Sequence, residues 1–132
     1  MRISNKILVL GLLLPGIGFA ASLDLPSGTQ AALHEVLLDK VGTEDYVRFR
    51  FVAPAIDRDM ELAPDHAALE GDFPHLCTAI ALPYMTEHGL SADKIVISLA
   101  DRVTDFGIAD PEATQYFEQF RAENGDCIWE GF

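Results

Sequence analysis

The residues best suited to chemistry in this chain lie in an acidic stretch between positions 66 and 75. His66 and His75 stand there with Glu70 and Asp72, and histidines beside carboxylates can hold a metal ion or transfer a proton. The spacing gives no sign that the four side chains converge. We keep them as candidate metal ligands, and as the residues of an alternative metal-dependent or acid/base hydrolase. We predict no catalytic residue, metal or cofactor.

A second pattern in the same region is typical of the start of a calcium-binding loop. It consists of the alternating acids Asp57, Asp59 and Glu61. The pattern fails at its sixth position, where Leu62 replaces the required glycine, and at its twelfth, where Ala68 replaces glutamate. The sequence therefore favours a solvated acidic loop over residues 54–70. A secreted inhibitor would present a loop of this kind, which gives a further alternative function.

The N-terminal residues 1–20, MRISNKILVLGLLLPGIGFA, have the composition of a secretory signal peptide. Arg2 and Lys6 precede an apolar run that ends in small residues, as signal peptidase requires. The run is shorter than the roughly 20 apolar residues of a membrane-spanning helix. We expect cleavage after Ala20, or after Ser22, and no stable membrane insertion of the product. The predicted location is periplasmic or secreted.

Cleavage would leave one small domain, residues 21–132, with a strongly acidic composition. The leader contains two of the nine Lys and Arg residues and none of the 21 Asp and Glu residues, so the remaining net charge is near −14. Such a surface repels phosphate backbones and anionic lipids. We therefore expect no nucleic acid partner, and we predict another protein of the cell envelope as the partner.

Two cysteines remain in this domain, Cys77 and Cys127. In an oxidising compartment an even number of cysteines in a small domain favours a disulfide. A metal site that uses His75 with Cys77, or a reactive thiol, is the alternative. The chain contains no C-x-x-C motif, so we predict the disulfide.

Hydrophobic patterning predicts an α+β fold. The strands are expected over residues 30–39, 46–53, 94–100, 116–123 and 126–131, where Asn124-Gly125 is a strong hairpin signal between the last two. A brief helical turn is expected at 111–115, with a full helix over 111–122 as the alternative.

A helix is expected over residues 73–88. Asp72 would cap its start, Pro83 would kink it and Gly89 would end it. The element order is strand–strand–helix–strand–strand–strand. It predicts a two-layer fold, in which one main helix packs on one face of a largely antiparallel five-stranded sheet.

The candidate binding residues lie outside the acidic loop. Asp101, Arg102 and Phe106 fall in a glycine-containing loop that could recognise a partner, and Trp129 lies near the aromatic C-terminus. Turn geometry and core packing explain the same residues equally well.

Several segments together resemble a family of uncharacterised secreted proteins of about 130 residues from alphaproteobacteria of the Rhodobacter type. The segments are HEV (34–36), RFRFVAP (48–54), DFPHLC (72–77), IVISLADR (95–102), DPEATQYF (110–117) and NGDCIWEGF (124–132). The resemblance implies a domain of unknown function, without an activity or a site. It strengthens the Cys77–Cys127 pairing, because both cysteines lie in matching segments. The main prediction is therefore a non-catalytic binding or accessory module of the cell envelope.

Overall fold

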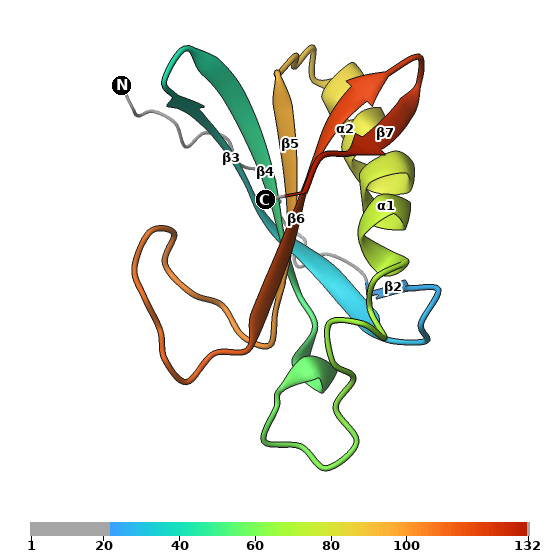
Figure 1. The fold of residues 1–132 in the computed structure, drawn as a ribbon, viewed down its shortest axis with the longest axis vertical. Coiled ribbons are helices and arrows are strands. Elements are labelled where there is room, and N and C mark those ends of the chain that lie inside the picture. The colour runs from blue at the N-terminus through green and yellow to red at the C-terminus, as the bar shows by residue number, and fades with distance from the viewer. Residues whose placement is uncertain (1–21, 132) are drawn as a thin grey trace.

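A single six-stranded sheet forms the centre of the fold, and one helical segment lies on one side of it (Figure 1). The computed structural model describes residues 22–131. The predicted leader, residues 1–20, lies outside the described residues. Between residues 22 and 131, no helix is both long enough and apolar enough to cross a membrane.

The strands stand in the sheet in the order in which they occur along the chain. They are β2 (Leu23–Asp24), β3 (Gln30–Val41), β4 (Glu44–Val52), β5 (Lys94–Ala100), β6 (Gln115–Glu123) and β7 (Asp126–Trp129). All neighbours are antiparallel except β4 and β5, which are parallel.

The predicted α+β class is confirmed, and the sheet is largely antiparallel as predicted, but it differs from the prediction in two details. The sheet has six strands because the two-residue strand β2 pairs with the start of β3. It is mixed because the chain between β4 and β5 contains the helical segment. A helix placed between two strands returns the chain to the end of the sheet where the first strand began, so the second strand runs parallel to the first.

Strand β4 shows the predicted alternation of side chains. Val47, Phe49 and Phe51 are buried on the helix side of the sheet, and the side chains of Arg48 and Arg50 extend from the opposite face. The β6–β7 hairpin also forms as predicted. It turns through Asn124 (φ 54°) and Gly125 (φ 81°), which is the left-handed pair that a tight two-residue hairpin requires.

The helical turn predicted at 111–115 and the alternative helix over 111–122 were both wrong. Residues 111–112 form a turn, and β6 already begins at Gln115. Strand β6 pairs along its length with β5, where Phe120 lies opposite Ile95. Pairing with a distant strand therefore decides the structure of this segment, overriding the local helix-start signal.

The helical segment runs continuously through α1 (Asp72–Leu76), a π-helical turn η3 (Cys77–Ala81) and α2 (Leu82–Glu87). The sequence predicted a distortion of the helix at Pro83, and the structure shows a π-helical turn just before it. Pro83 has no N–H, and its ring would clash with the carbonyl four residues earlier in a regular helix. The wider turn instead pairs the Leu82 N–H with the Cys77 carbonyl. Gly89, with φ 64°, follows the helix as expected.

Asp72 does not cap the helix as predicted, because it lies inside the first turn and Gly71 occupies the cap position. Its buried carboxylate instead accepts hydrogen bonds from the Ser27 N–H (2.9 Å) and from the Ser27 hydroxyl (2.6 Å). Asp72 therefore connects the helix to the turn between β2 and β3.

The hydrophobic core lies between the helical segment and the sheet. Its fully buried side chains include Phe49, Phe51, Ile95, Ile97, Leu99 and Phe120 from the sheet and Phe73, Leu76 and Cys77 from the helix. Cys77 forms a disulfide with Cys127 of β7 (S–S 2.06 Å). This bond joins the helix to the last strand and supports the predicted pairing.

Candidate binding groove

The four residues considered for metal or acid/base chemistry do not form one site. Asp72 is engaged with Ser27, whereas Glu70 and His75 are exposed. His66 contacts Glu118 of β6 instead, with 2.7 Å between Nε2 and Oε2. In the part of the chain that the structure describes, no group of three or more His, Cys, Asp or Glu residues is arranged to hold a metal ion.

The contact between His66 and Glu118 extends to Trp129. The Trp129 indole N–H donates a hydrogen bond to the second oxygen of Glu118, and the His66 ring lies 5.3 Å from the ring of Tyr116. These contacts hold the segment before the helix against β6 and β7. Sequence reasoning missed them because the partners are far apart in the chain and share no motif.

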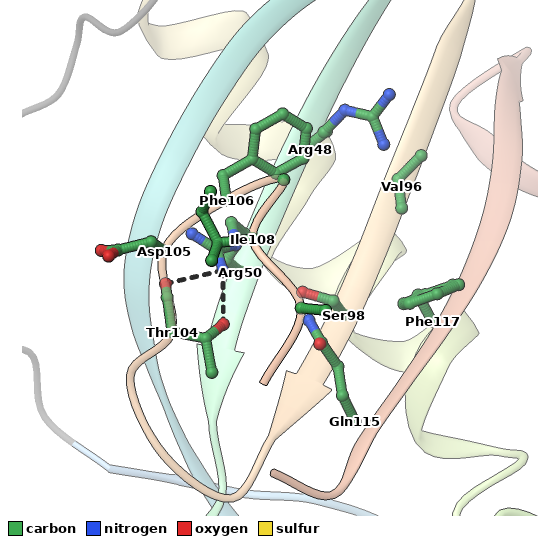
Figure 2. A pocket seen from close by; sticks show the side chains of 12 residues that line it. Arg48, Arg50, Val96, Ser98, Thr104, Asp105, Phe106, Ile108, Gln115 and Phe117 are labelled. Atoms are coloured by element: carbon green, nitrogen blue, oxygen red, sulfur yellow. Dashed lines mark hydrogen bonds between the residues drawn. The ribbon is translucent and has the colours of Figure 1, made fainter. Parts of the chain in front are cut away.

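The opposite face of the sheet carries a groove with a volume of about 330 Å³ (Figure 2). The loop of residues 101–114, between β5 and β6, extends on the side of the sheet away from the helix (Figure 1). Residues 104–109 of this loop form one wall. The other wall and the floor come from strands β4, β5 and β6. Their lining residues are Arg48, Arg50, Val96, Ser98, Gln115 and Phe117.

Asp101 closes the base of the loop. Its Oδ1 accepts the Thr114 N–H (2.8 Å), its own N–H donates to the Thr114 carbonyl (3.0 Å), and its Oδ2 accepts from the Arg102 guanidinium (2.7 Å). Burial alone would raise the pKa of Asp101, but the hydrogen bonds from Arg102 and Thr114 outweigh it and hold the pKa below its ordinary value. The predicted binding candidates Asp101 and Arg102 thus hold the loop in place.

Arg58 is a second anchor of the loop that the sequence did not reveal. Its guanidinium donates to the carbonyls of Ala113 (2.9 Å) and Pro111 (2.6 Å). Its backbone N–H donates to the Thr114 hydroxyl (2.9 Å). Arg58 therefore fixes the chain just before β6, and the loop is held at its base from two sides.

Arg50, on the strand side of the groove, holds the loop wall in place. Its Nη2 donates to the carbonyl and the hydroxyl of Thr104, both at 2.9 Å (Figure 2), and its Nη1 forms an ion pair with Glu35. The neighbouring Arg48 donates to both carboxylate oxygens of Asp39 (2.8 and 3.2 Å). The two guanidinium groups thus have acidic partners on β3.

Phe106 of the loop lies over both arginines. Its ring centre is 5.1 Å from Cζ of Arg48 and 5.7 Å from Cζ of Arg50, which are cation–π distances. The predicted candidate Phe106 therefore belongs to the groove, whereas Trp129 lies on β7 and does not line it.

Comparison with known proteins gives a family for this chain. A family model described as Family of unknown function (DUF6497) matches residues 14–132. The chain belongs to this family. No curated protein and no solved structure matches the chain. All residues of the groove lie inside the matched region.

The groove of this DUF6497 chain combines a serine hydroxyl that has no partner among residues 22–131 with exposed apolar side chains. Ser98 is only 7% exposed, and its hydroxyl has no hydrogen-bond partner among residues 22–131. Around it, Phe106 is 48% exposed, Ile108 67% and Phe117 50%. Figure 2 shows Phe106 and Ile108 on the loop side, and Ser98, Gln115 and Phe117 on the strand side. Such a groove can bury an apolar group and hydrogen-bond a polar one.

Proposed function

We propose that this protein is an exported, non-catalytic binding module of the cell envelope, which holds a segment of another envelope protein in the groove under loop 101–114. The observation that carries the proposal is the Ser98 hydroxyl, which has no hydrogen-bond partner among residues 22–131 and opens onto the floor of a groove with exposed apolar walls. The residue itself is only 7% exposed, so an occupant of the groove would cover this hydroxyl and must supply it with a hydrogen bond, which selects a polar group at that point.

The proposed location, periplasmic or secreted, has separate support. The disulfide between Cys77 and Cys127 is a bond that persists in oxidising compartments and is rare in the cytosol. The first residues of the chain have the composition of a signal peptide.

The geometry gives the hydrolase alternative less support than the binding module. His66 and His75 do not meet, and no histidine lines the groove. The inhibitor alternative rests on one observation, which is that Leu62 in loop 54–70 is 93% exposed. An exposed leucine on a loop could enter a pocket of a target enzyme, so the test must compare this loop with the groove.

Site-specific photo-crosslinking separates the two binding surfaces. A photoreactive amino acid would replace Ile108 beside the groove in one variant and Leu62 in another, and both would be expressed in cells that export the protein. We expect a reproducible crosslinked protein from position 108, which disappears when Phe117→Asp is added. Because both positions are exposed, the variant at 62 is a matched control for random collisions.

A crosslinked partner at position 62 and none at position 108 would favour the inhibitor. Absence of a product at both positions would contradict the binding module. Near-ultraviolet circular dichroism of each purified variant would confirm that the fold is retained.

A further inference from the structure

The two arginines at the floor of the groove suggest a positively charged site, but their charges are neutralised by neighbouring carboxylates. Arg48 is paired with Asp39, and Arg50 with Glu35. The ring of Phe106 also covers both guanidinium groups. Each positive charge at the floor therefore has its own carboxylate, and the floor offers little attraction to an anion.

The excess of negative charge lies on the loop that forms the other wall, where carboxylates outnumber the one basic side chain. Asp105 lines the groove and forms no ion pair among residues 22–131. Asp110, further along the loop, accepts a hydrogen bond from the Glu112 N–H (3.1 Å) and shares the field of Arg102 with other carboxylates. The one basic residue of the loop, Arg102, is bound to Asp101 and lies 3.9 Å from Glu112. The rim of the groove is therefore negative, beside exposed Phe106 and Ile108.

We propose that the groove binds a polypeptide segment in which a lysine or arginine stands next to a large apolar side chain. This inference rests on the proposed binding function. The cation pairs with Asp105 and Asp110, and the apolar side chain packs between Ile108 and Phe117. A backbone or side-chain polar group of the segment supplies the missing partner of Ser98. The groove is open along the loop, where the neighbouring Val103 is also 64% exposed, so we take the occupant to be an extended chain.

A second copy of this protein does not have the required chemistry. All seven basic side chains between residues 22 and 131 already have partners within the chain. Two copies would also bring together chains that each carry a strong negative charge, and like charges repel. The partner is therefore a different, basic polypeptide.

Fluorescence anisotropy with labelled peptides tests this chemistry on the protein purified from the periplasm. One peptide alternates Lys and Arg with Leu and Phe, and its counterpart has Glu in place of each basic residue. We expect the basic peptide to bind more tightly, with an affinity that falls as salt is added. Ile108→Ser should weaken binding about tenfold through lost apolar burial.

A matched pair of charge variants distinguishes the groove from the general acidity of the protein. Asp105→Asn with Asp110→Asn should lower the affinity roughly fivefold. Asp59→Asn with Glu61→Asn removes the same charge from exposed positions on loop 54–70 and should change it by less than about twofold. Equal losses in both double variants would show binding to overall charge and would overturn the proposal.

The remaining outcomes separate this inference from the proposed function. Tighter binding of the acidic peptide would overturn the inference and leave the binding module standing. If the basic peptide fails to bind while position 108 still crosslinks to a protein, the inference is likewise overturned and the binding module stands. If no peptide binds and position 108 gives no crosslink, both proposals fail.

Discussion

The two faces of the sheet use different coverings. On one face the helical segment and the disulfide enclose side chains such as Phe49 and Ile97, which are fully buried. On the other face loop 101–114 covers the strands incompletely, leaving Ile108 and Phe117 exposed and the Ser98 hydroxyl without a partner.

The difference separates a closed core, which stabilises the fold, from the proposed binding surface. A helix satisfies its own backbone groups and presents a continuous apolar side to the sheet, so it seals a core. A loop held at its base, at Thr104 and through the Phe106 ring does not seal a face, and an incompletely covered groove is where a ligand gains most from burial. Substitutions on the helix side should therefore change stability, and those on the loop side should change binding.

The largest contrast is expected between Phe49→Ala and Ile108→Ala. Phe49 is fully buried and packs edge-on against Tyr84 at 5.5 Å between ring centres, so its truncation should lower the free energy of unfolding by about 5 kcal/mol. Ile108→Ala should change it by less than about 0.5 kcal/mol, since that side chain is 67% exposed. Urea unfolding of both variants measures the difference, and similar losses would refute the division between the faces.

The disulfide offers the next largest effect. It joins residues 50 apart in the sequence, and replacing both cysteines by alanine should cost about 4 kcal/mol, because the unfolded chain gains conformational freedom. The groove should keep its structure, because Cys77 and Cys127 lie on the other side of the sheet. Guanidinium unfolding gives the loss, and the amide NMR signals of residues 104–109 should not move; large shifts there would show that the faces are coupled.

Two serines provide a matched pair across the sheet. Ser27→Ala removes a hydroxyl that donates to the buried carboxylate of Asp72, and should cost about 1.5 kcal/mol. Ser98→Ala removes a hydroxyl without a partner among residues 22–131, and should change stability by less than about 0.5 kcal/mol. Thermal unfolding compares the two variants. A loss for Ser98→Ala as large as that for Ser27→Ala would argue against an open groove.

The smallest effect concerns the loop anchor at Asp101 and its dependence on pH. The folded-state pKa of Asp101 lies below the ordinary value of 3.8. The unfolded state therefore binds the proton more readily, and the stabilisation is present above about pH 4 and lost as the pH falls through the lowered pKa. Asp101→Asn should cost about 1 kcal/mol at pH 7.

Denaturant unfolding at pH 7 and in acid checks this prediction. The difference between Asp101→Asn and the unsubstituted protein should shrink as Asp101 becomes protonated. A difference that stays constant with pH would show that the carboxylate charge is not what holds the loop. Asp59→Asn, on an exposed site, is the control for a general effect of charge.

The features that could be predicted from the sequence depend on near neighbours in the chain. The alternation at Phe49 and Arg50, the turn at Asn124-Gly125 and the helix distortion at Pro83 follow from local geometry. The pairing of Cys77 with Cys127 followed from their number and the expected compartment.

The features that were missed depend on distant partners. The parallel pairing of β4 with β5 is set by the path of the crossover, and the two-residue strand β2 gains its structure only from β3. Phe106 was named as a candidate, but the groove around it requires Arg58 to meet Thr114 and Arg50 to meet Thr104, more than 50 positions apart. No local sequence pattern indicates contacts between residues so far apart in the chain.

The parallel pair at the centre of the sheet has a consequence for how the chain folds. Tyr46 of β4 lies opposite Lys94 of β5, so the strands meet only after the long intervening segment has closed, whereas the β3–β4 and β6–β7 hairpins close locally. We expect the hairpins to form early and the central pair late, on the slower timescale of sheets with many non-local pairings. Until then the inner edge of β4, with Phe49 and Phe51, is open to pairing with other chains. The acidic composition of the protein then opposes aggregation, since it keeps incompletely folded chains apart.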